Sequence, residues 1–264
     1  MNKIILNADD FGLSEDHNNA VLKGYNAEMS SSASLIVNSE FFNDAVNNVI
    51  KVCPKLNIVI HLNIMEGKPL TKCPLLCNRD NTFSMNYLYL ILMQYNKEVQ
   101  KQIENEFRAQ IEKAIQNGVK INRLDSHVHT HAIPEIFKIV CKLAKEYNIE
   151  YVRTQFENPY LVFPECFSIK FAINLIKVAL LDFFTLINRR IIKKYNIKTN
   201  DILIGVCYTG MMSSKIISAG IKKYKDKIIE IIIHPCDDNK KGSQYKEFLI
   251  TQDSDLKANL LNKM

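Results

Sequence analysis

Tryptophan is absent from the 264-residue sequence, and only 8 of the residues are glycine. None of the 7 cysteines forms a CxxC pair, so we expect reduced thiols in the core and loops of a cytoplasmic protein. Neither GxGxxG nor GxxxxGK(S/T) occurs, which leaves a nucleotide site without support. A membrane span needs about 20 nearly unbroken apolar residues. The most apolar stretch, residues 167–192, is interrupted by Lys170, Asn174, Lys177 and Asp182, so we expect no membrane partner.

A strong excess of charge of one sign is also lacking. The 34 basic and 28 acidic residues leave a formal net charge of +6, and the basic residues are spread apart from short clusters such as Arg189-Arg190. We therefore expect no nucleic-acid partner. Hydrophobic residues make up 47% of the chain and charged residues 23%, as is typical of a globular protein. Because no break in composition interrupts the chain, we expect one domain over residues 1–264.

Short apolar runs alternate with amphipathic helical patterns along the chain. The expected strands are residues 4–7, 34–37, 58–62, 121–126, 150–153, 202–206 and 228–233. Two stretches, 67–96 and 155–200, are expected to be insertions, and the second should hold one long apolar helix. Seven strand–helix units predict a parallel α/β sheet that is closed, or nearly closed, as a (β/α) barrel. A doubly wound open sheet is the alternative.

Polar side chains follow four of the predicted strands. Because the C-terminal ends of parallel strands meet at one face of such a fold, we expect these side chains to converge there. A lone histidine such as His61 or His234 is more often a packed or surface residue, and Asp9-Asp10 could be a simple turn. Three histidines within five residues are harder to explain in this way, because imidazoles are costly to bury without partners. The residues are Asp9, Asp10, His61, His127, His129, His131 and His234.

One aspartate and two histidines form a common ligand set for a catalytic divalent metal. Three protein ligands leave coordination positions open for water and substrate. Spacing alone does not select which histidines of the His127-x-His129-x-His131 segment would bind. Adjacent Asp9 and Asp10 point to opposite sides of an ideal strand, so both reach one site only if the strand twists or turns there.

Four motifs, in this order, resemble those of the YdjC-like carbohydrate deacetylases, a family that includes chito-oligosaccharide deacetylases. The resemblance extends from about residue 2 to at least residue 240. It implies a TIM-barrel-like fold and hydrolysis of N-acetyl groups on short N-acetylglucosamine-containing oligosaccharides. The motifs are Asn7-Ala8-Asp9-Asp10-Phe11-Gly12, His61-Leu62-Asn63 with Gly67-x-Pro69-Leu70, Leu124-Asp125-Ser126-His127-x-His129-x-His131, and His234-Pro235.

The resemblance also implies roles for individual residues. One divalent metal ion would be held by Asp10, His61 and His127; family members commonly use magnesium, and this ligand set also suits zinc, cobalt or manganese. Asp9 would be the general base and His234 the general acid. Contacts to the substrate or around the ligands would come from His129, His131 and Arg153, of which Arg153 would orient Asp9 or the substrate.

Two departures from the family pattern bear on the substrate. Cys236 follows His234-Pro235 where a glycine is frequent, and the insertion at 155–200 is rich in Phe, Ile and Lys. The alternative functions are another metal hydrolase, such as a phosphoesterase with two or three metal ions, or a sugar-binding protein without activity. The apolar helix expected within 168–195 is apolar on more than one face, so we expect it to cover the mouth of the site or a partner subunit, the latter giving a homodimer.

Overall fold

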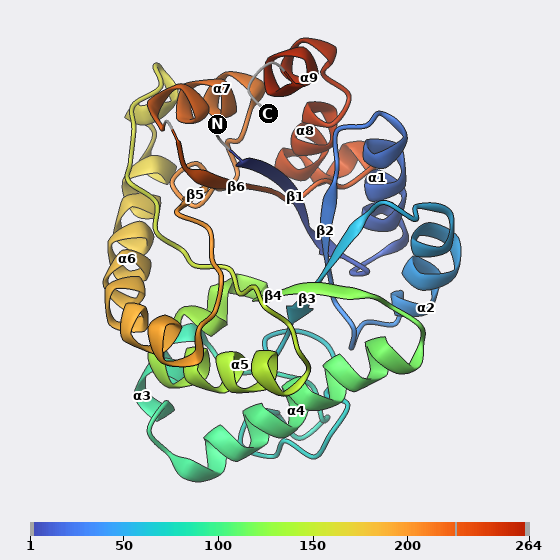
Figure 1. Ribbon diagram of the computed structural model, residues 1–264, viewed down its shortest axis with the longest axis vertical. Coiled ribbons are helices and arrows are strands. Elements are labelled where there is room, and N and C mark those ends of the chain that lie inside the picture. Colours follow the sequence, from blue (N-terminus) through green and yellow to red (C-terminus); the bar gives the residue numbers. More distant parts are fainter. Residues whose placement is uncertain (1–2, 225, 262–264) are drawn as a thin grey trace.

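Six parallel strands form one sheet in the order β4-β3-β2-β1-β6-β5, which curls into a half-barrel (Figure 1). The computed structural model describes residues 3–224 and 226–261. The strands are β1 (Lys3–Phe11), β2 (Ser32–Leu35), β3 (Asn57–Leu62), β4 (Ile121–Ser126), β5 (Ile202–Ile204) and β6 (Ile228–Ile233). The helices are α1 (Glu15–Asn26), α2 (Phe42–Asp44), α3 (Tyr87–Met93), α4 (Lys97–Gln116), α5 (Pro134–Glu146), α6 (Ile169–Tyr195), α7 (Ser214–Lys223), α8 (Ser243–Ile250) and α9 (Ser254–Leu261). The predicted barrel-like parallel α/β fold is confirmed, with six strands rather than seven in the described chain.

Short polar residues begin several of the helices. The side chains of Ser14 and Asn96 accept hydrogen bonds from backbone N–H groups in the first turns of α1 and α4. Pro134 lies in the first turn of α5, where a backbone N–H would have no helical partner. Gly118 follows α4 with a φ of +75°, a conformation that favours glycine and ends the helix. These local signals fix where these helices begin and end.

An irregular segment, residues 150–156, closes the open side of the curled sheet. The prediction of a regular strand at 150–153 is wrong, because only isolated bridges form there. One reason is that the backbone groups of Thr154 are bonded by a side chain: Asn200 accepts from its N–H and donates to its carbonyl. The bridges tie the segment to both sides of the gap, between Leu124 and Val152 and between Tyr151 and Lys198.

Alternate strand residues give the sheet a polar inner face. Asn7, Ser34 and Glu230 are among the side chains that point there, and each is at most 1% exposed. Charged and polar groups are costly to bury without partners, so these side chains have to bond one another. The intervening residues, such as Leu6 and Ile231, belong to the apolar core. The polar inner face leads to the C-terminal ends of the strands.

Helix α6 runs for 27 residues along the side of the barrel (Figure 1). Its inner face is buried through Phe171 and Leu181, and Asn174 donates hydrogen bonds to the carbonyls of Cys207 and Thr209. In the described chain it is the one helix that is long and apolar enough to cross a membrane, and 39% of its most apolar 18-residue window is buried. A core helix of a folded protein meets the same criterion, and these contacts tie α6 to the loop after β5.

Candidate active site

The two aspartates at the end of β1 reach the same cavity because the strand turns there. Asp10 has a φ of +64°, and the register between β1 and β2 shifts between Ala8 and Phe11. A left-handed residue at a bulge interrupts the alternation of strand side chains, so the neighbouring carboxylates no longer point to opposite faces. Both Asp9 and Asp10 line the cavity. The strand therefore turns at Asp10, the condition predicted from the sequence for Asp9 and Asp10 to share one site.

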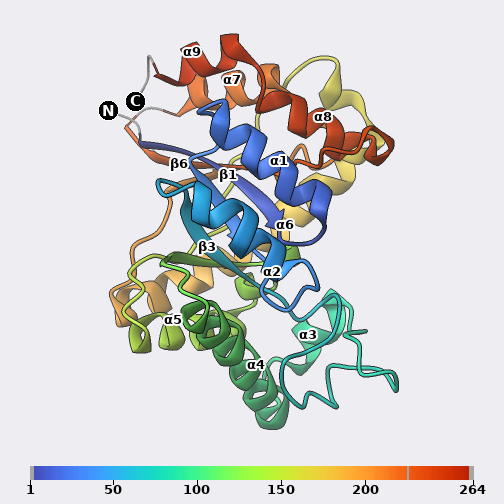
Figure 2. The same cartoon turned by 90° about the vertical axis from the view of Figure 1, so that its right-hand side faces the viewer.

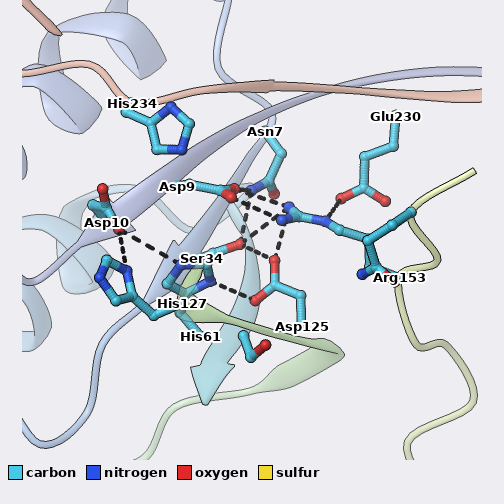
Figure 3. Close-up of polar contacts among 12 residues, drawn as sticks. Asn7, Asp9, Asp10, Ser34, His61, Asp125, His127, Arg153, Glu230 and His234 are labelled. Atoms are coloured by element: carbon cyan, nitrogen blue, oxygen red, sulfur yellow. Dashed lines mark hydrogen bonds and ion pairs between the residues drawn. The ribbon is translucent and has the colours of Figure 1, made fainter. Parts of the chain in front are cut away.

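Asp10, His61 and His127 bring three possible metal-ligand atoms within 4.8 Å of one another (Figure 3). Asp10 Oδ1 lies 2.9 Å from His127 Nδ1 and 3.6 Å from His61 Nε2. The other nitrogen of His61, Nδ1, lies 2.7 Å from Asp125 Oδ1. A carboxylate behind a histidine fixes which ring nitrogen is free to ligate, and here that nitrogen is Nε2.

The surrounding carboxylates control the charge of both histidines. Burial alone would lower the pKa of His61, but the charge of Asp125 and the neighbouring carboxylate of Asp10 raise it to about 9. Burial is likewise outweighed at His127, where a hydrogen bond to Asp10 and the nearby carboxylate of Glu66 raise the pKa to about 10. The metal-free site therefore holds a proton on each histidine at neutral pH, and a metal ion has to displace both protons.

Arg153 lies buried among three carboxylates (Figure 3). Its two terminal nitrogens bond Asp9 at 2.8 and 2.9 Å, one of them also lies 2.7 Å from Asp125 Oδ2, and Nε bonds Glu230 Oε1 at 2.8 Å. Burial raises the pKa of Asp9, but the charges of Arg153 and His61 outweigh burial and lower it, so Asp9 is an ionised acceptor. Of the two roles expected for Arg153, the geometry favours orienting Asp9.

A second group with the chemistry of a metal site, Asp9, His61 and Asp125, lies beside the first. The guanidinium of Arg153 already bonds both of these carboxylates. A fixed cation at this position repels a divalent ion and satisfies the oxygens that would bind it. The described residues therefore fit one metal ion here rather than two.

His234 follows β6 and lines the same cavity as Asp9 and Asp10. Its Nδ1 lies 3.3 Å from Glu247 Oε2, and its backbone N–H donates to the same oxygen. Burial alone would lower the pKa of His234, but Glu247 raises it to about 9. The imidazole is thus protonated at neutral pH and can donate a proton into the cavity.

The chain turns directly after His127, which separates the other two histidines of the motif. Val128 and His129 have φ values of 53° and 56°, so β4 does not continue. His129 lines the cavity, and burial together with the charge of Arg153 lowers its pKa to about 3, which keeps it neutral. His131 is fully buried and its Nε2 lies 3.0 Å from the Arg153 carbonyl, outside the cavity wall. Of the two, His129 is therefore the one placed to meet a ligand.

The site residues form the floor of a cavity of about 390 Å³. Its walls come from α3, from α6 and from the loops after β4 and β5. Most wall side chains are apolar, so the polar groups are concentrated at the floor, as is common for cavities that orient a small ligand. The wall residues are Tyr87, Val128, Lys177, Leu180, Leu181, Val206 and Thr209.

Sequence reasoning missed the carboxylates that orient the site. Glu230 is the one residue of β6 that is not isoleucine, and Asp125 is a charged residue near the end of β4; a charge at a buried strand position requires a partner. That signal was available. Glu66 and Glu247 carry no comparable signal, because only the folded chain brings them next to the site histidines.

Fold and site together define a barrel-like α/β protein with a candidate metal centre at the C-terminal ends of its strands. The chain belongs to the YdjC-like protein family, whose model matches residues 3–261.

Relatives named carbohydrate deacetylase match a little over half of the chain. The protein from Halalkalibacterium halodurans is 35% identical over 60% of this chain and 65% of its own length. The protein from Brevibacillus brevis is 38% identical over 56% of this chain and 57% of its own length. The matched segments thus span less than two thirds of these relatives. A solved structure from Enterococcus faecalis V583, named for cellobiose-phosphate cleavage, matches with a TM-score of 0.76 at 18% identity, covering 100% of this chain and 95% of that one.

Proposed function

We propose that the protein is a metal-dependent carbohydrate deacetylase that hydrolyses the N-acetyl group of an acetylated amino sugar. The observation that carries the proposal is the Asp10–His61–His127 cluster, with ionised Asp9 and protonated His234 lining the same cavity. The relatives named carbohydrate deacetylase support it. Short N-acetylglucosamine-containing oligosaccharides are the first candidate substrates.

Asp10, His61 and His127 would hold one divalent metal ion. One carboxylate oxygen and two imidazole nitrogens suit magnesium, manganese, zinc or cobalt. When bound, the ion polarises the acetamide carbonyl and makes a nearby water more acidic. The hydrogen bond that His61 Nδ1–H donates to Asp125 supports this ligand set, because it directs Nε2 toward Asp10.

Asp9 and His234 would move the protons of the reaction. Asp9 takes a proton from the attacking water, and Arg153 holds the Asp9 carboxylate in place. The water oxygen bonds the acetamide carbon, the C–N bond breaks, and His234 donates its proton to the departing nitrogen. The products are acetate and a free amine, and each such proton transfer typically contributes about 10²–10⁴ in rate.

Acetate release from N-acetylglucosamine oligosaccharides tests the function. We expect turnover that disappears after chelation and returns with one added divalent ion per chain. Asp10→Asn is expected to abolish turnover and metal binding, whereas Asp80→Asn, in an exposed loop, is the matched control. Acetate release that survives both chelation and Asp10→Asn would contradict the proposal. Phosphate release from a phosphoester with two or three bound ions would favour the phosphoesterase alternative.

Cytoplasmic location and a homodimer are proposals that rest on the sequence. Light scattering of the purified chain at micromolar concentration measures the second directly, since a dimer has twice the 30.4 kDa mass of the chain.

A further inference from the structure

Exposed apolar side chains are concentrated on the two insertions that border the cavity. In the part of the chain that the structure describes, ten of the twenty large hydrophobic side chains that are exposed lie between residues 161 and 187. Three more, Leu88, Leu92 and Tyr95, lie on α3 or just after it. An apolar surface of this extent usually marks a binding surface.

Helix α6 has apolar residues on opposite faces. The inner face packs into the fold through residues such as Phe171, Val178 and Leu181. On the other side, exposed residues recur every three or four positions and form what we term the outer stripe: Ile169, Ile173, Ile176, Leu180, Phe183 and Ile187. Leu180 belongs to the outer stripe and also lines the cavity, so the stripe continues into the cavity wall.

Helix α3 presents a similar apolar face to the same cavity. Tyr87 lines the cavity, and its hydroxyl donates to the His129 carbonyl at 3.2 Å. Leu88 and Leu92, four residues apart, share the neighbouring face of the helix and are 62% and 71% exposed. Figure 2 shows α3 on the side of the molecule toward which β1 runs, where the strand ends carry the site. Two insertions far apart in the sequence thus supply apolar surface to one cavity.

We propose that the substrate is an acetylated amino sugar joined to a long apolar group, such as an alkyl chain, that lies against α6 and α3. This inference rests on the proposed deacetylase function and specifies its substrate class. The acetamide of the sugar lies at the polar floor of the cavity, and the apolar group leaves it past Leu180 and Tyr87 toward the outer stripe. Among the described wall residues, Tyr87, Lys177 and Thr209 have polar groups, and the Tyr87 hydroxyl already donates to the His129 carbonyl. A long polar oligosaccharide therefore finds few hydrogen-bond partners on these walls.

A second copy of the chain is the other occupant that the sequence suggests for α6. A protein covering both α3 and α6 would lie across the cavity that they border and obstruct its mouth. Charge also opposes pairing through α6, because two copies meeting there would bring like charges together, so a homodimer would form through another surface. The basic residues of α6 are Lys170, Lys177, Arg189, Arg190, Lys193 and Lys194, against the single acidic residue Asp182.

Alkyl N-acetylglucosaminides of increasing chain length test the inference. The measured quantity is kcat/KM for acetate release from the methyl, butyl, hexyl and octyl glycosides, each below its micelle concentration, beside an N-acetylglucosamine oligosaccharide. Each CH₂ buried against the walls should raise kcat/KM by roughly twofold to fourfold. If about half of the CH₂ groups added between methyl and octyl are buried, the rise in kcat/KM is at least about tenfold.

Serine substitutions on the outer stripe link the effect to α6. Ile176→Ser and Leu180→Ser are expected to flatten the dependence of kcat/KM on chain length. Ile115→Ser is the matched control, because Ile115 is an exposed isoleucine of α4 that does not line the cavity. It should leave the dependence unchanged.

The outcomes separate this inference from the function on which it rests. Equal kcat/KM for all chain lengths, or a preference for the oligosaccharide, overturns the inference and leaves the deacetylase function standing. Acetate release from none of the substrates overturns the deacetylase function, and the inference with it. If Ile176→Ser converts a dimer into a monomer without changing the chain-length dependence, the outer stripe binds a second copy, and the inference is again overturned.

Discussion

Asp9 and Asp10 are neighbours in the chain but have different partners. Both oxygens of Asp9 are bonded by the guanidinium of Arg153, whereas Asp10 Oδ1 faces the imidazoles of His61 and His127. The left-handed backbone at Asp10 makes this division possible, since a regular strand would direct the two carboxylates to opposite faces. One carboxylate is thus arranged as a proton acceptor and the other as a metal ligand.

Replacing Asp9 by asparagine should remove the base and leave the metal ligands in place. We expect Asp9→Asn to lower kcat by about 10²–10⁴, because an amide cannot accept the proton of the attacking water. Metal content, measured by elemental analysis, should stay at one ion per chain, and Asp80→Asn should behave as the unmodified protein. Near-native turnover in Asp9→Asn would make Asp9 a structural residue, and loss of the metal would mean that Asp9 shares the ligand role of Asp10.

Replacing Asp125 by asparagine should weaken metal binding although Asp125 is not in the proposed ligand set. The carboxylate fixes the ring of His61 through Nδ1, and removal of such a partner typically lowers metal affinity about 10–100-fold. Titration calorimetry of the metal-free protein measures the change. Glu66→Gln is the comparison, because Glu66 is exposed and lies 3.8 Å from His127. Equal affinity in Asp125→Asn and the unmodified protein would refute this role.

Strand β6 supplies a charged residue in a run of isoleucines, and that residue joins the sheet to the irregular segment 150–156. Glu230 bonds Arg153 Nε at 2.8 Å and lies 3.3 Å from Arg123 Nη1. The register places Glu230 beside Ile5 of β1 and Leu203 of β5, within the sheet. Glu230 therefore neutralises two arginines that would otherwise be buried with fewer partners.

Replacing Glu230 by glutamine should destabilise the fold. Breaking a buried ion pair on one side typically costs about 3 kcal/mol or more, because the remaining charge stays buried. Urea unfolding followed by circular dichroism measures the free energy of unfolding. Glu150→Gln is the control: Glu150 pairs with Lys198 at the surface, where ion pairs contribute little, so the unfolding midpoint should not move. A Glu230→Gln midpoint equal to that of the control would rule out this role.

Elements governed by local signals were predictable, and those governed by distant side chains were not. Ser14, Asn96 and Pro134 mark helix starts in the sequence, and the parallel topology brings residues after different strands to one face. The segment at 150–153 has strand-like residues, but the sequence does not show that the Asn200 side chain bonds the backbone N–H and carbonyl of Thr154. The left-handed turn at Val128 and His129 was equally hidden, because a β-branched residue such as Val128 rarely adopts that conformation.

The whole molecule should respond to pH and to metal in a linked way. In the metal-free protein, His61 and His127 have pKa values raised to about 9 and about 10 from an ordinary value of about 6.5. Because both histidines bind a proton more tightly in the folded than in the unfolded chain, their protonation stabilises the fold. This stabilisation is complete below about pH 6.5 and is lost as the pH rises through 9 and 10. We therefore expect the melting midpoint of the metal-free protein to fall across this range, and the stabilisation by added metal to grow.

Two measurements check this linkage. Thermal melting from pH 6 to pH 10, with and without metal, gives the two curves. Calorimetry in buffers of different ionisation enthalpy counts the protons released on binding, for which we expect up to about two per ion near pH 7.5. A pH-independent midpoint together with no proton release would show that the histidines are neutral before metal binds.

Arg153 comes from the irregular segment on the open side of the sheet, yet it bonds Asp9 of β1, Asp125 of β4 and Glu230 of β6. The Arg153 side chain therefore links three strands of the sheet to the irregular segment on its open side. The same side chain orients Asp9, the proposed base, and Asp125, which bonds the proposed metal ligand His61. This has an evolutionary consequence. A mutation that removes Arg153 takes the guanidinium from three buried carboxylates, of which Asp125 keeps His61 and Glu230 keeps Arg123 as a partner, and a mutation of any carboxylate weakens both the fold and the site. These four positions should therefore diverge together among YdjC-like proteins, so that a lineage which abandons this chemistry replaces the set rather than a single member.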